Sequence, residues 1–232
     1  MHIRLSLSVV ILAALAFAGA AGANQVSVLE STDSEILLEL ATDDFSVDEV
    51  VHGGERHFRV SAPLYDLLLE PGMPRLPQKG VLAGVPFGAD VRLEIVSVET
   101  ERVGVFDIEP APEVGYVERE GMVQATEKYV RDVAFYDRGT VWPATRAELG
   151  FDDTLRHQRV VQVTFHPFGW SPRTHVLEVH TRIVVRLVLS ETRDAVGVTP
   201  AVASEPQWEG VYSGTVVNYE SARSWRARPL PR

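Results

Sequence analysis

The segment from residue 175 to residue 189 constrains the fold of this chain more than any other part of the sequence. Its apolar side chains occupy odd-numbered positions and its polar side chains even-numbered ones: Leu177, Val179, Ile183, Val185, Leu187 and Leu189 against Glu178, His180, Arg182 and Arg186. A period of two places the two sets on opposite faces of a β-strand. The sequence therefore predicts a long strand with one buried face and one solvated face.

Two further segments carry a similar signature. Residues 91–97 begin with strict alternation and should place Val91, Leu93 and Ile95 on one face of a strand. Residues 159–165 are rich in β-branched side chains and lead into a turn of proline, glycine and aromatic residues at 166–172. No helical periodicity of comparable strength follows residue 23. These patterns predict an all-β, β-sandwich-like domain of many short strands.

Turn and loop signals organise the remaining residues. Segments 45–47 and 57–60 predict a hairpin that turns at 52–55, where two glycines lie. The proline-rich segment 70–77 predicts an edge strand or a crossing loop, because proline cannot donate to a strand ladder. Residues 113–138 have few periodic apolar positions and predict a long loop with at most one short helical turn. Loops of that length are often functional.

The N-terminus has the pattern of a secretory signal peptide. His2 and Arg4 precede an apolar run at residues 9–18, and Ala21-Gly22-Ala23 follows with small residues at the cleavage position. We expect cleavage after Ala23, because the apolar run is too short to span a bilayer comfortably. The expected product is extracytoplasmic and bacterial, with no membrane contact after the signal is removed.

Four segments are expected along the chain. Residues 1–23 form the signal peptide, and residues 24–189 form the β-sandwich domain. Residues 190–223 form a linker followed by a segment whose aromatic and β-branched side chains can dock onto the core. Residues 224–232 form an exposed tail rich in arginine and proline.

Composition excludes several classes of protein. None of the 232 residues is a cysteine, which rules out disulfides, a thiolate nucleophile and Cys-ligated metal centres. The formal net charge of -10 argues against a nucleic-acid partner, which requires a basic face to neutralise phosphates. An exported domain without disulfides must rely on its hydrophobic core, and this combination is typical of bacteria.

Motifs for catalysis or for a cofactor are not apparent. Residues 210–214 lack the spacing of a nucleophile elbow, and neither a P-loop nor a dinucleotide-binding glycine motif is present. No histidine pair has the H-E-x-x-H spacing, and a regular strand would send His175 and His180 to opposite faces. We expect the histidines to be solvated, and we expect neither a metal nor a cofactor.

Two weaker site hypotheses compete with structural explanations. The acidic pairs at 43–44 and 152–153 offer hard oxygen ligands for Ca²⁺, but adjacent loop acids are usually only solvated. Trp142, Trp170 and Trp208 are candidates for a sugar-stacking platform, but packing in the core or at its edge is favoured.

An ordered series of motifs gives the chain a family resemblance. Gly72-Met73-Pro74-Arg75-Leu76-Pro77 followed by Val85-Pro86-Phe87-Gly88-Ala89 resembles the gingipain-type propeptide, the N-terminal prodomain of C25-family cysteine endopeptidases. Later segments agree in order and spacing over roughly residues 70–223: Ile108-Glu109-Pro110, Phe135-Tyr136, Trp142-Pro143, residues 159–165 and 166–172, residues 180–185, and Asn218-Tyr219-Glu220 through Arg223.

The resemblance implies a β-sandwich prodomain that assists folding and keeps a cognate C25-type catalytic domain latent, in cis or in trans. It implies a basic side chain that enters the specificity pocket, where an arginine can pair bidentately with a carboxylate. The family presents this side chain in the loop after Ile108-Glu109-Pro110. Arg119 is the nearest basic residue there, and Lys128 and Arg131 are the competing candidates.

The resemblance also implies removal by cleavage after the arginine that closes the Asn-Tyr-Glu segment, Arg223, with Arg226 and Arg228 as alternatives. The family's catalytic cysteine and histidine lie beyond the propeptide, so a chain without cysteine is not itself the peptidase. The alternative function is a secreted β-sandwich binding or adhesion module that uses exposed Trp and Tyr, for example for glycans. A hydrolase with an unrecognised carboxylate pair ranks third.

Overall fold

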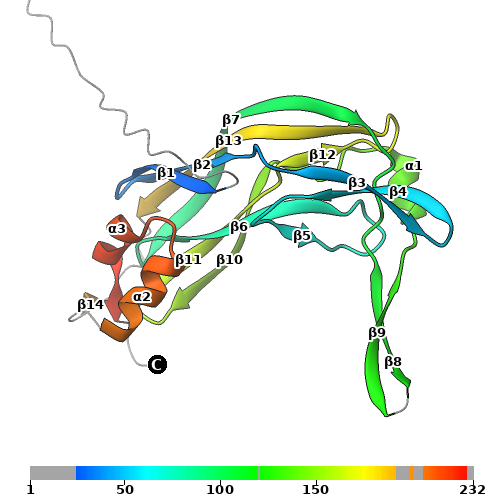
Figure 1. The fold of residues 1–232 in the computed structure, drawn as a ribbon. Helices are drawn as coiled ribbons and strands as arrows, with labels where there is room; N and C mark the ends of the chain where they lie inside the picture. Colours follow the sequence, from blue (N-terminus) through cyan, green and yellow to red (C-terminus); the bar gives the residue numbers. More distant parts are fainter. Residues whose placement is uncertain (1–24, 120, 192–198, 201–205, 229–232) are drawn as a thin grey trace, which may run out of the picture.

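Two antiparallel sheets form the body of the protein in the computed structural model (Figure 1), which describes residues 25–119, 121–191, 199–200 and 206–228. In the larger sheet the order is β1-β2-β13-β12, and β7 pairs with the opposite edge of β13. Its strands are β1 (Val26–Ser31), β2 (Glu35–Ala41), β7 (Ala89–Val105), β12 (Phe168–Trp170) and β13 (Val176–Glu191). The second sheet has the order β10-β11-β6-β5, from β5 (Asp66–Leu68), β6 (Leu76–Gly84), β10 (Ala147–Leu155) and β11 (Gln158–Phe165).

The core lies between these two sheets. All six odd-numbered apolar side chains of the alternating segment are buried, and Ile183, Val185 and Leu187 are 0% exposed. Four of them, from Ile183 to Leu189, pack with apolar side chains of β2, β6, β10 and β11, among them Ile36, Leu38, Leu40, Ala83, Ala147, Val163 and Phe165. Leu177 and Val179 pack in a second cluster with Phe168 and Trp170. Each sheet buries one apolar face against the other, which is the arrangement that stabilises a sandwich. The predicted β-sandwich-like, all-β fold is confirmed.

Three two-stranded ladders and four short helical segments complete the described part of the chain. The ladders are β3 (Ser46–His52) with β4 (Glu55–Ser61), β8 (Glu113–Arg119) with β9 (Met122–Lys128), and β14 (Thr199–Pro200) with β15 (Ala227–Arg228). The helical segments are α1 (Val133–Arg138), α2 (Pro206–Thr215), α3 (Tyr219–Ala222) and the 3₁₀ helix η1 (Arg223–Trp225). The predicted turn at 52–55 is confirmed, with Gly53 and Gly54 at φ values of 60° and 90°.

The prediction of a long loop over residues 113–138 is wrong. Strands β8 and β9 form a hairpin in this segment, and α1 follows it. Helix α1 begins after Asp132, whose side chain accepts a hydrogen bond from the Phe135 N–H. It ends at Arg138 and is followed by Gly139 in the left-handed conformation. Side-chain alternation does not predict the hairpin, because its apolar side chains are exposed and do not mark a buried face.

Strand β7 departs from the predicted alternation at Ile95. Val91 and Leu93 pack on the core as expected, but Ile95 is 43% exposed. The register against β13 shifts between Val184 and Val185, which leaves Val96 without a partner in the ladder. This β-bulge changes the parity of the strand, so that the core-facing position resumes at Val98.

Several polar side chains are buried that the sequence placed in solvent, and one tryptophan is buried as the sequence analysis favoured. His57, His166 and His180 are 4%, 3% and 1% exposed, so the prediction of solvated histidines is wrong for these three. Trp170 is fully buried, and its indole N–H donates to the Phe106 carbonyl at 2.8 Å. It therefore cannot belong to an exposed sugar-stacking platform.

Two negative observations apply to the described residues. They contain no group of three or more His, Asp or Glu side chains arranged to hold a metal ion. Among the same residues, none of the helices is both long and apolar enough to cross a membrane. The predicted signal peptide and its cleavage position after Ala23 lie outside the described part of the chain.

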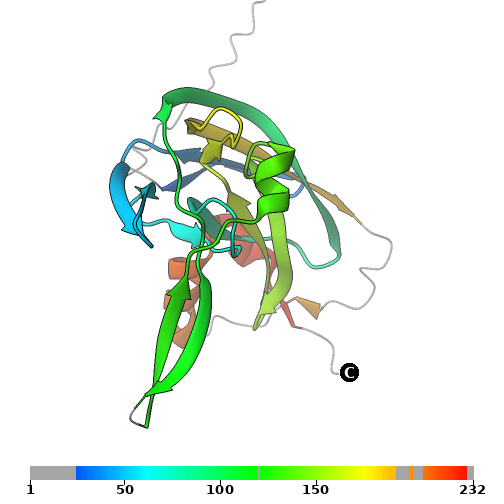
Figure 2. The ribbon, with the colours of Figure 1, turned by 90° about the vertical axis from the view of Figure 1, so that its right-hand side faces the viewer.

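The β8–β9 hairpin projects from one end of the body, as Figures 1 and 2 show from two directions. Helices α2 and α3 lie at the other end, beside β6 and β11. The molecule therefore carries its two most distinctive features, the hairpin and the C-terminal helices, at opposite ends of the sandwich.

Candidate functional site

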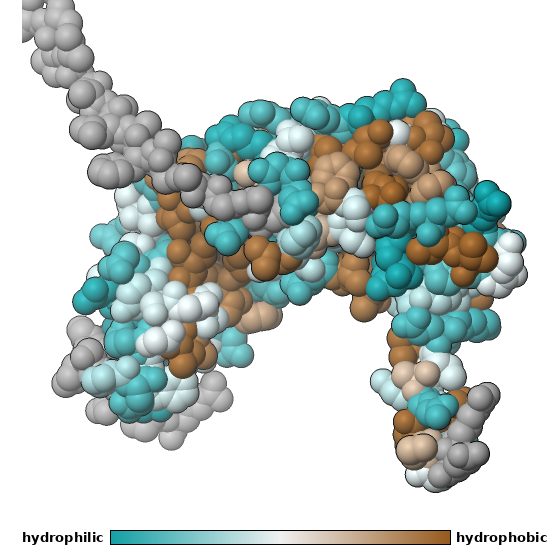
Figure 3. Space-filling model, viewed as in Figure 1, coloured by the Kyte–Doolittle hydropathy of each residue, from teal (hydrophilic) through white to brown (hydrophobic). Residues whose placement is uncertain are grey.

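The β8–β9 hairpin presents apolar side chains to solvent. Tyr116 is 73% exposed, Val123 is 72% exposed and Met122 is 60% exposed. Figure 3 shows apolar side chains on the hairpin where it leaves the body. In the described part of the chain no other strand pairs with β8 or β9. Because an isolated two-stranded hairpin is marginally stable, its position depends on how its base is attached.

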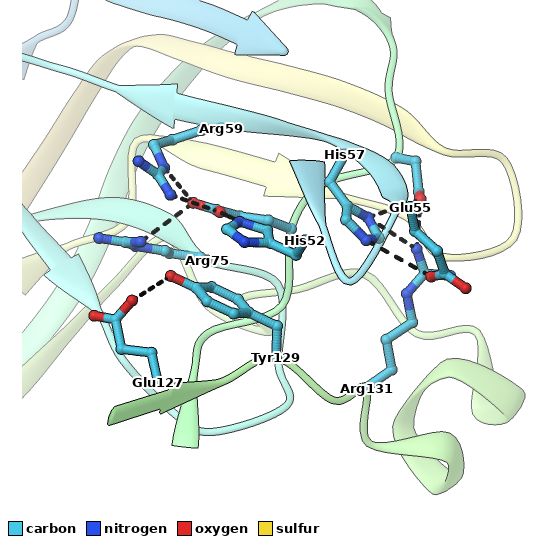
Figure 4. Close-up of polar contacts among 10 residues, drawn as sticks. His52, Glu55, His57, Arg59, Arg75, Glu127, Tyr129 and Arg131 are labelled. Atoms are coloured by element: carbon cyan, nitrogen blue, oxygen red, sulfur yellow. Dashed lines mark hydrogen bonds and ion pairs between the residues drawn. The ribbon is translucent and has the colours of Figure 1, made fainter. Parts of the chain in front are cut away.

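Two clusters of charged and aromatic side chains attach this base to the body, and together they are called the base cluster here (Figure 4). The first is built on Glu109, which is fully buried in the segment that leads into β8. Arg59 donates from Nε and Nη2 to the two carboxylate oxygens at 2.5 and 2.9 Å, and Arg75 donates to the same carboxylate at 3.3 Å. His52 Nε2 lies 2.7 Å from Oε2. Burial alone would raise the pKa of Glu109, but the hydrogen bonds from Arg59 and His52 lower it overall.

The contact between His52 and Tyr129 extends this cluster to the hairpin. Their rings stack with centroids 3.6 Å apart and an interplanar angle of 13°. The Tyr129 hydroxyl donates to Glu127, the penultimate residue of β9, at 2.5 Å. Glu109 is thereby linked through His52 to the returning strand of the hairpin.

The second cluster is built on Asp107. Its Oδ2 accepts a short hydrogen bond from Arg131 and lies 3.1 Å from His57 Nδ1. The Arg131 guanidinium also lies over the Tyr136 ring, with its carbon 5.2 Å from the centroid. His175 Nδ1 is 3.7 Å from Oδ1 of the same carboxylate. Asp107 therefore ties the residues just after β9 to the β3–β4 ladder and to the start of β13.

The backbone between Asp107 and Glu109 is also held by hydrogen bonds. Phe58 N–H donates to the Asp107 carbonyl at 2.8 Å, and Glu109 N–H donates back to the Phe58 carbonyl at 3.0 Å. On the other side, Arg75 N–H donates to the Glu109 carbonyl at 2.9 Å. The segment is thus paired between β4 and the proline-rich stretch before β6. The entry of the hairpin is positioned by main-chain and side-chain contacts together.

The candidate basic residues differ in where the fold puts them. Arg119 is the last residue of β8 and pairs with Met122 at the tip, and its side chain lies outside the described part. Lys128 ends β9 at the base, opposite Glu113, and is exposed. Arg131 is bound to Asp107 and packs on Tyr136. The three are therefore not gathered at one point.

The candidate processing residues lie at the other end of the molecule. Arg223 belongs to η1, and its side chain is 58% exposed beside Glu220. Arg226 is 12% exposed and paired with Glu209. The backbone of Arg228 is in β15, and its side chain lies outside the described part.

Local sequence does not single out the base cluster. Glu109 belongs to the Ile108-Glu109-Pro110 motif, which is part of the family resemblance. The motif identifies the segment but does not indicate that its charge is buried. Its partners His52, Arg59 and Arg75 are separated from it by 34 to 57 positions and meet it only in the folded chain.

Comparison with known proteins finds a matching family model and solved structures of similar fold. The family model Propeptide_C25 matches residues 18–225. A chain from the complex of the pro- and mature domains of RgpB from Porphyromonas gingivalis is similar with a TM-score of 0.68 at 23% identity, and the match covers 84% of this chain and 98% of that one. A structure on the zymogenic latency of gingipain K from the same bacterium has a TM-score of 0.59 at 18% identity, covering 74% and 95%. No curated protein sequence matches at a significant level.

Proposed function

The chain belongs to the C25 propeptide family, and from that premise we propose that it keeps a secreted, gingipain-like cysteine endopeptidase inactive, assists the folding of that enzyme and is removed by cleavage after an arginine. Its partner is the catalytic domain of a cognate C25 peptidase, in cis or in trans. The RgpB structure with a similar fold is described as a complex of pro- and mature domains. Both partners are extracytoplasmic.

The observation that carries the inhibitory role is the projecting hairpin. Exposed side chains such as Tyr116 and Val123 offer apolar surface that a partner protein can cover. The base cluster holds the hairpin in one direction before the partner arrives. Such preorganisation lowers the entropic cost of binding, because the contact segment is already ordered.

Among the basic candidates, we propose that Arg119 enters the specificity pocket. It stands at the tip of the hairpin, the part farthest from the body. Arg131 would have to abandon its contacts with Asp107 and Tyr136 to reach a pocket, and Lys128 lies at the base beside the body. An arginine at the tip can form a bidentate hydrogen-bonded pair with a pocket carboxylate.

The direct test is a titration of the purified chain against an arginine-specific C25 peptidase. We expect inhibition below micromolar concentration, and Arg119→Ala should raise the inhibition constant about 100-fold, because a buried charge pair loses one partner. Arg56→Ala is the matched control, since Arg56 is 78% exposed on β4. Absence of inhibition at micromolar concentration would contradict the inhibitory role. Unchanged inhibition by Arg119→Ala, with a loss on Lys128→Ala, would contradict the assignment of Arg119.

A further inference from the structure

Residues 206–226, which we call the C-terminal latch, are docked onto the sandwich by specific polar contacts. The side-chain amide of Asn218, which is 4% exposed, accepts from the Gly84 N–H at 2.8 Å and donates to the Gly84 carbonyl at 2.9 Å. The Val217 N–H donates to the Leu82 carbonyl at 2.9 Å. The latch therefore satisfies backbone groups of β6 as a neighbouring strand would.

A close apolar fit accompanies these hydrogen bonds. Ala222 is 1% exposed and packs with Val160 and Val216. A Cβ atom built on Gly84 would lie only 2.4 Å from the Ala222 Cβ, so the space for α3 exists because residue 84 has no side chain. Helix α3 is thus seated against the sheet at a position that requires a glycine.

The latch also reaches the β1–β2 turn. The hydroxyl of Ser221 lies 2.6 Å from that of Ser31, and the Trp225 indole N–H donates to Asp33 at 2.7 Å. These contacts bracket Arg223, which lies between Ser221 and Trp225 in the sequence. The backbone around Arg223 is therefore held on both sides.

Arg226 pairs with Glu209 and so links the end of the latch to its beginning. Its Nη1 and Nη2 donate to the Glu209 carboxylate at 2.6 and 3.3 Å, and the Tyr219 hydroxyl donates to the same carboxylate at 2.6 Å. The guanidinium also lies over the Tyr212 ring at 4.2 Å. The hydrogen bonds from Arg226 and then Tyr219 lower the pKa of Glu209, so the carboxylate is charged at neutral pH. The pair joins the two ends of the latch, α2 and the residue after η1.

These contacts have a consequence for cleavage. An endopeptidase binds its substrate in an extended conformation and takes the side chain before the scissile bond into its pocket. The Arg223–Ser224 bond is in a helical segment directly after the buried Ala222, and the Arg226 side chain is covered. The Arg228–Pro229 bond is a poor alternative cleavage site. The proline after the scissile carbonyl has no N–H, and its ring constrains the backbone.

We propose that the Arg223–Ser224 bond is a cryptic processing site for an arginine-specific endopeptidase, cleaved only when the latch undocks, and that the Glu209–Arg226 pair controls the undocking. Hydrolysis consumes one water and leaves a carboxylate on Arg223 and an amine on Ser224. The inference rests on the proposed function for its biological setting, in which maturation waits for undocking of the C-terminal segment.

The test uses trypsin, which cleaves after arginine and needs no affinity for the hairpin. The native full chain is digested beside a synthetic peptide of residues 216–230, and cleavage at Arg223 is followed by mass spectrometry. We expect the bond to be cut at least 100-fold more slowly in the chain than in the peptide. Cleavage of the chain at the rate of the peptide would overturn the proposal.

Two variants test the control by Glu209. Glu209→Gln should speed cleavage at Arg223 about tenfold, and Tyr219→Phe should speed it less, because it removes one of the hydrogen bonds to Glu209. Glu70→Gln, which removes an exposed carboxylate elsewhere, is the matched control. Cleavage at Lys128 is monitored in the same digest and should stay constant, which distinguishes undocking from global unfolding. An unchanged rate at Arg223 in both variants would overturn the role of the pair and would leave inhibition by the hairpin untouched.

Discussion

Glu109 and Arg59 form a hydrogen-bonded pair with two contacts, at 2.5 and 2.9 Å, although the Glu109 side chain has no exposed surface. A buried carboxylate is tolerated only when its charge is compensated and its oxygens are hydrogen-bonded. Here Arg75 and His52 complete that compensation. Glu109 lies four residues before β8, so the pair determines how the chain enters the projecting hairpin.

Replacement of Glu109 by Gln should destabilise the fold by about 3 kcal/mol, because two arginines would then be left partly buried without their counter-charge. Urea unfolding followed by circular dichroism measures this change. Glu113→Gln, at an exposed position on β8, should change the free energy of unfolding by less than about 0.5 kcal/mol. Equal effects of the two variants would show that Glu109 does not anchor the hairpin.

His180 should make the stability of the protein depend on pH. Burial, and then the charge of Arg146, lowers the pKa of His180 from 6.5 to about 4. Because the folded pKa is the lower one, the unfolded chain binds the proton first. The stabilisation is complete above about pH 6.5 and is lost progressively as the pH falls toward 4, by about 3 kcal/mol in total.

The measurement is the free energy of unfolding in urea at pH 7.5 and at pH 5. The wild-type protein should lose about 2 kcal/mol more between these values than His180→Gln, which keeps a group able to bond Thr100 but cannot be protonated. Identical losses in the two proteins would contradict the linkage.

Asn218→Ala should weaken the docking of the C-terminal latch. The variant leaves the N–H and the carbonyl of Gly84 without the hydrogen bonds at 2.8 and 2.9 Å, so we expect a loss of about 2 kcal/mol. Differential scanning calorimetry measures the shift of the melting temperature. Ser213→Ala, at an exposed position on α2, serves as the control and should melt with the wild type. A wild-type melting temperature for Asn218→Ala would contradict the docking.

The exposed apolar residues of the hairpin should matter for binding and not for folding. The double variant Tyr116→Ser and Val123→Ser removes two side chains that are 73% and 72% exposed. We expect the free energy of unfolding to change by less than about 0.5 kcal/mol, while the inhibition constant against a C25 peptidase rises at least tenfold. A loss of stability with unchanged inhibition would place these residues in the fold and not in the interface.

The strands that pack on the core were predictable because their side chains obey a local rule. In β13 the burial of Ile183, Val185 and Leu187 follows directly from an alternation that can be read residue by residue. The same rule misplaces Ile95, because a bulge at Val96 depends on how β7 pairs with β13 and leaves no local trace. It also misses β8 and β9, whose apolar side chains face solvent.

The family resemblance, the all-β class and the exclusion of a cysteine nucleophile were determined by the sequence alone, since ordered motifs, side-chain alternation and composition are properties of the chain itself. The base cluster and the C-terminal latch were decided by the tertiary structure. Glu109 meets Arg59 and His52, and Asn218 meets Gly84, across separations of 50 to 134 positions. Hydrogen bonds and ion pairs act over a few ångströms and carry no periodic pattern, so only the folded arrangement of the strands specifies which groups they join.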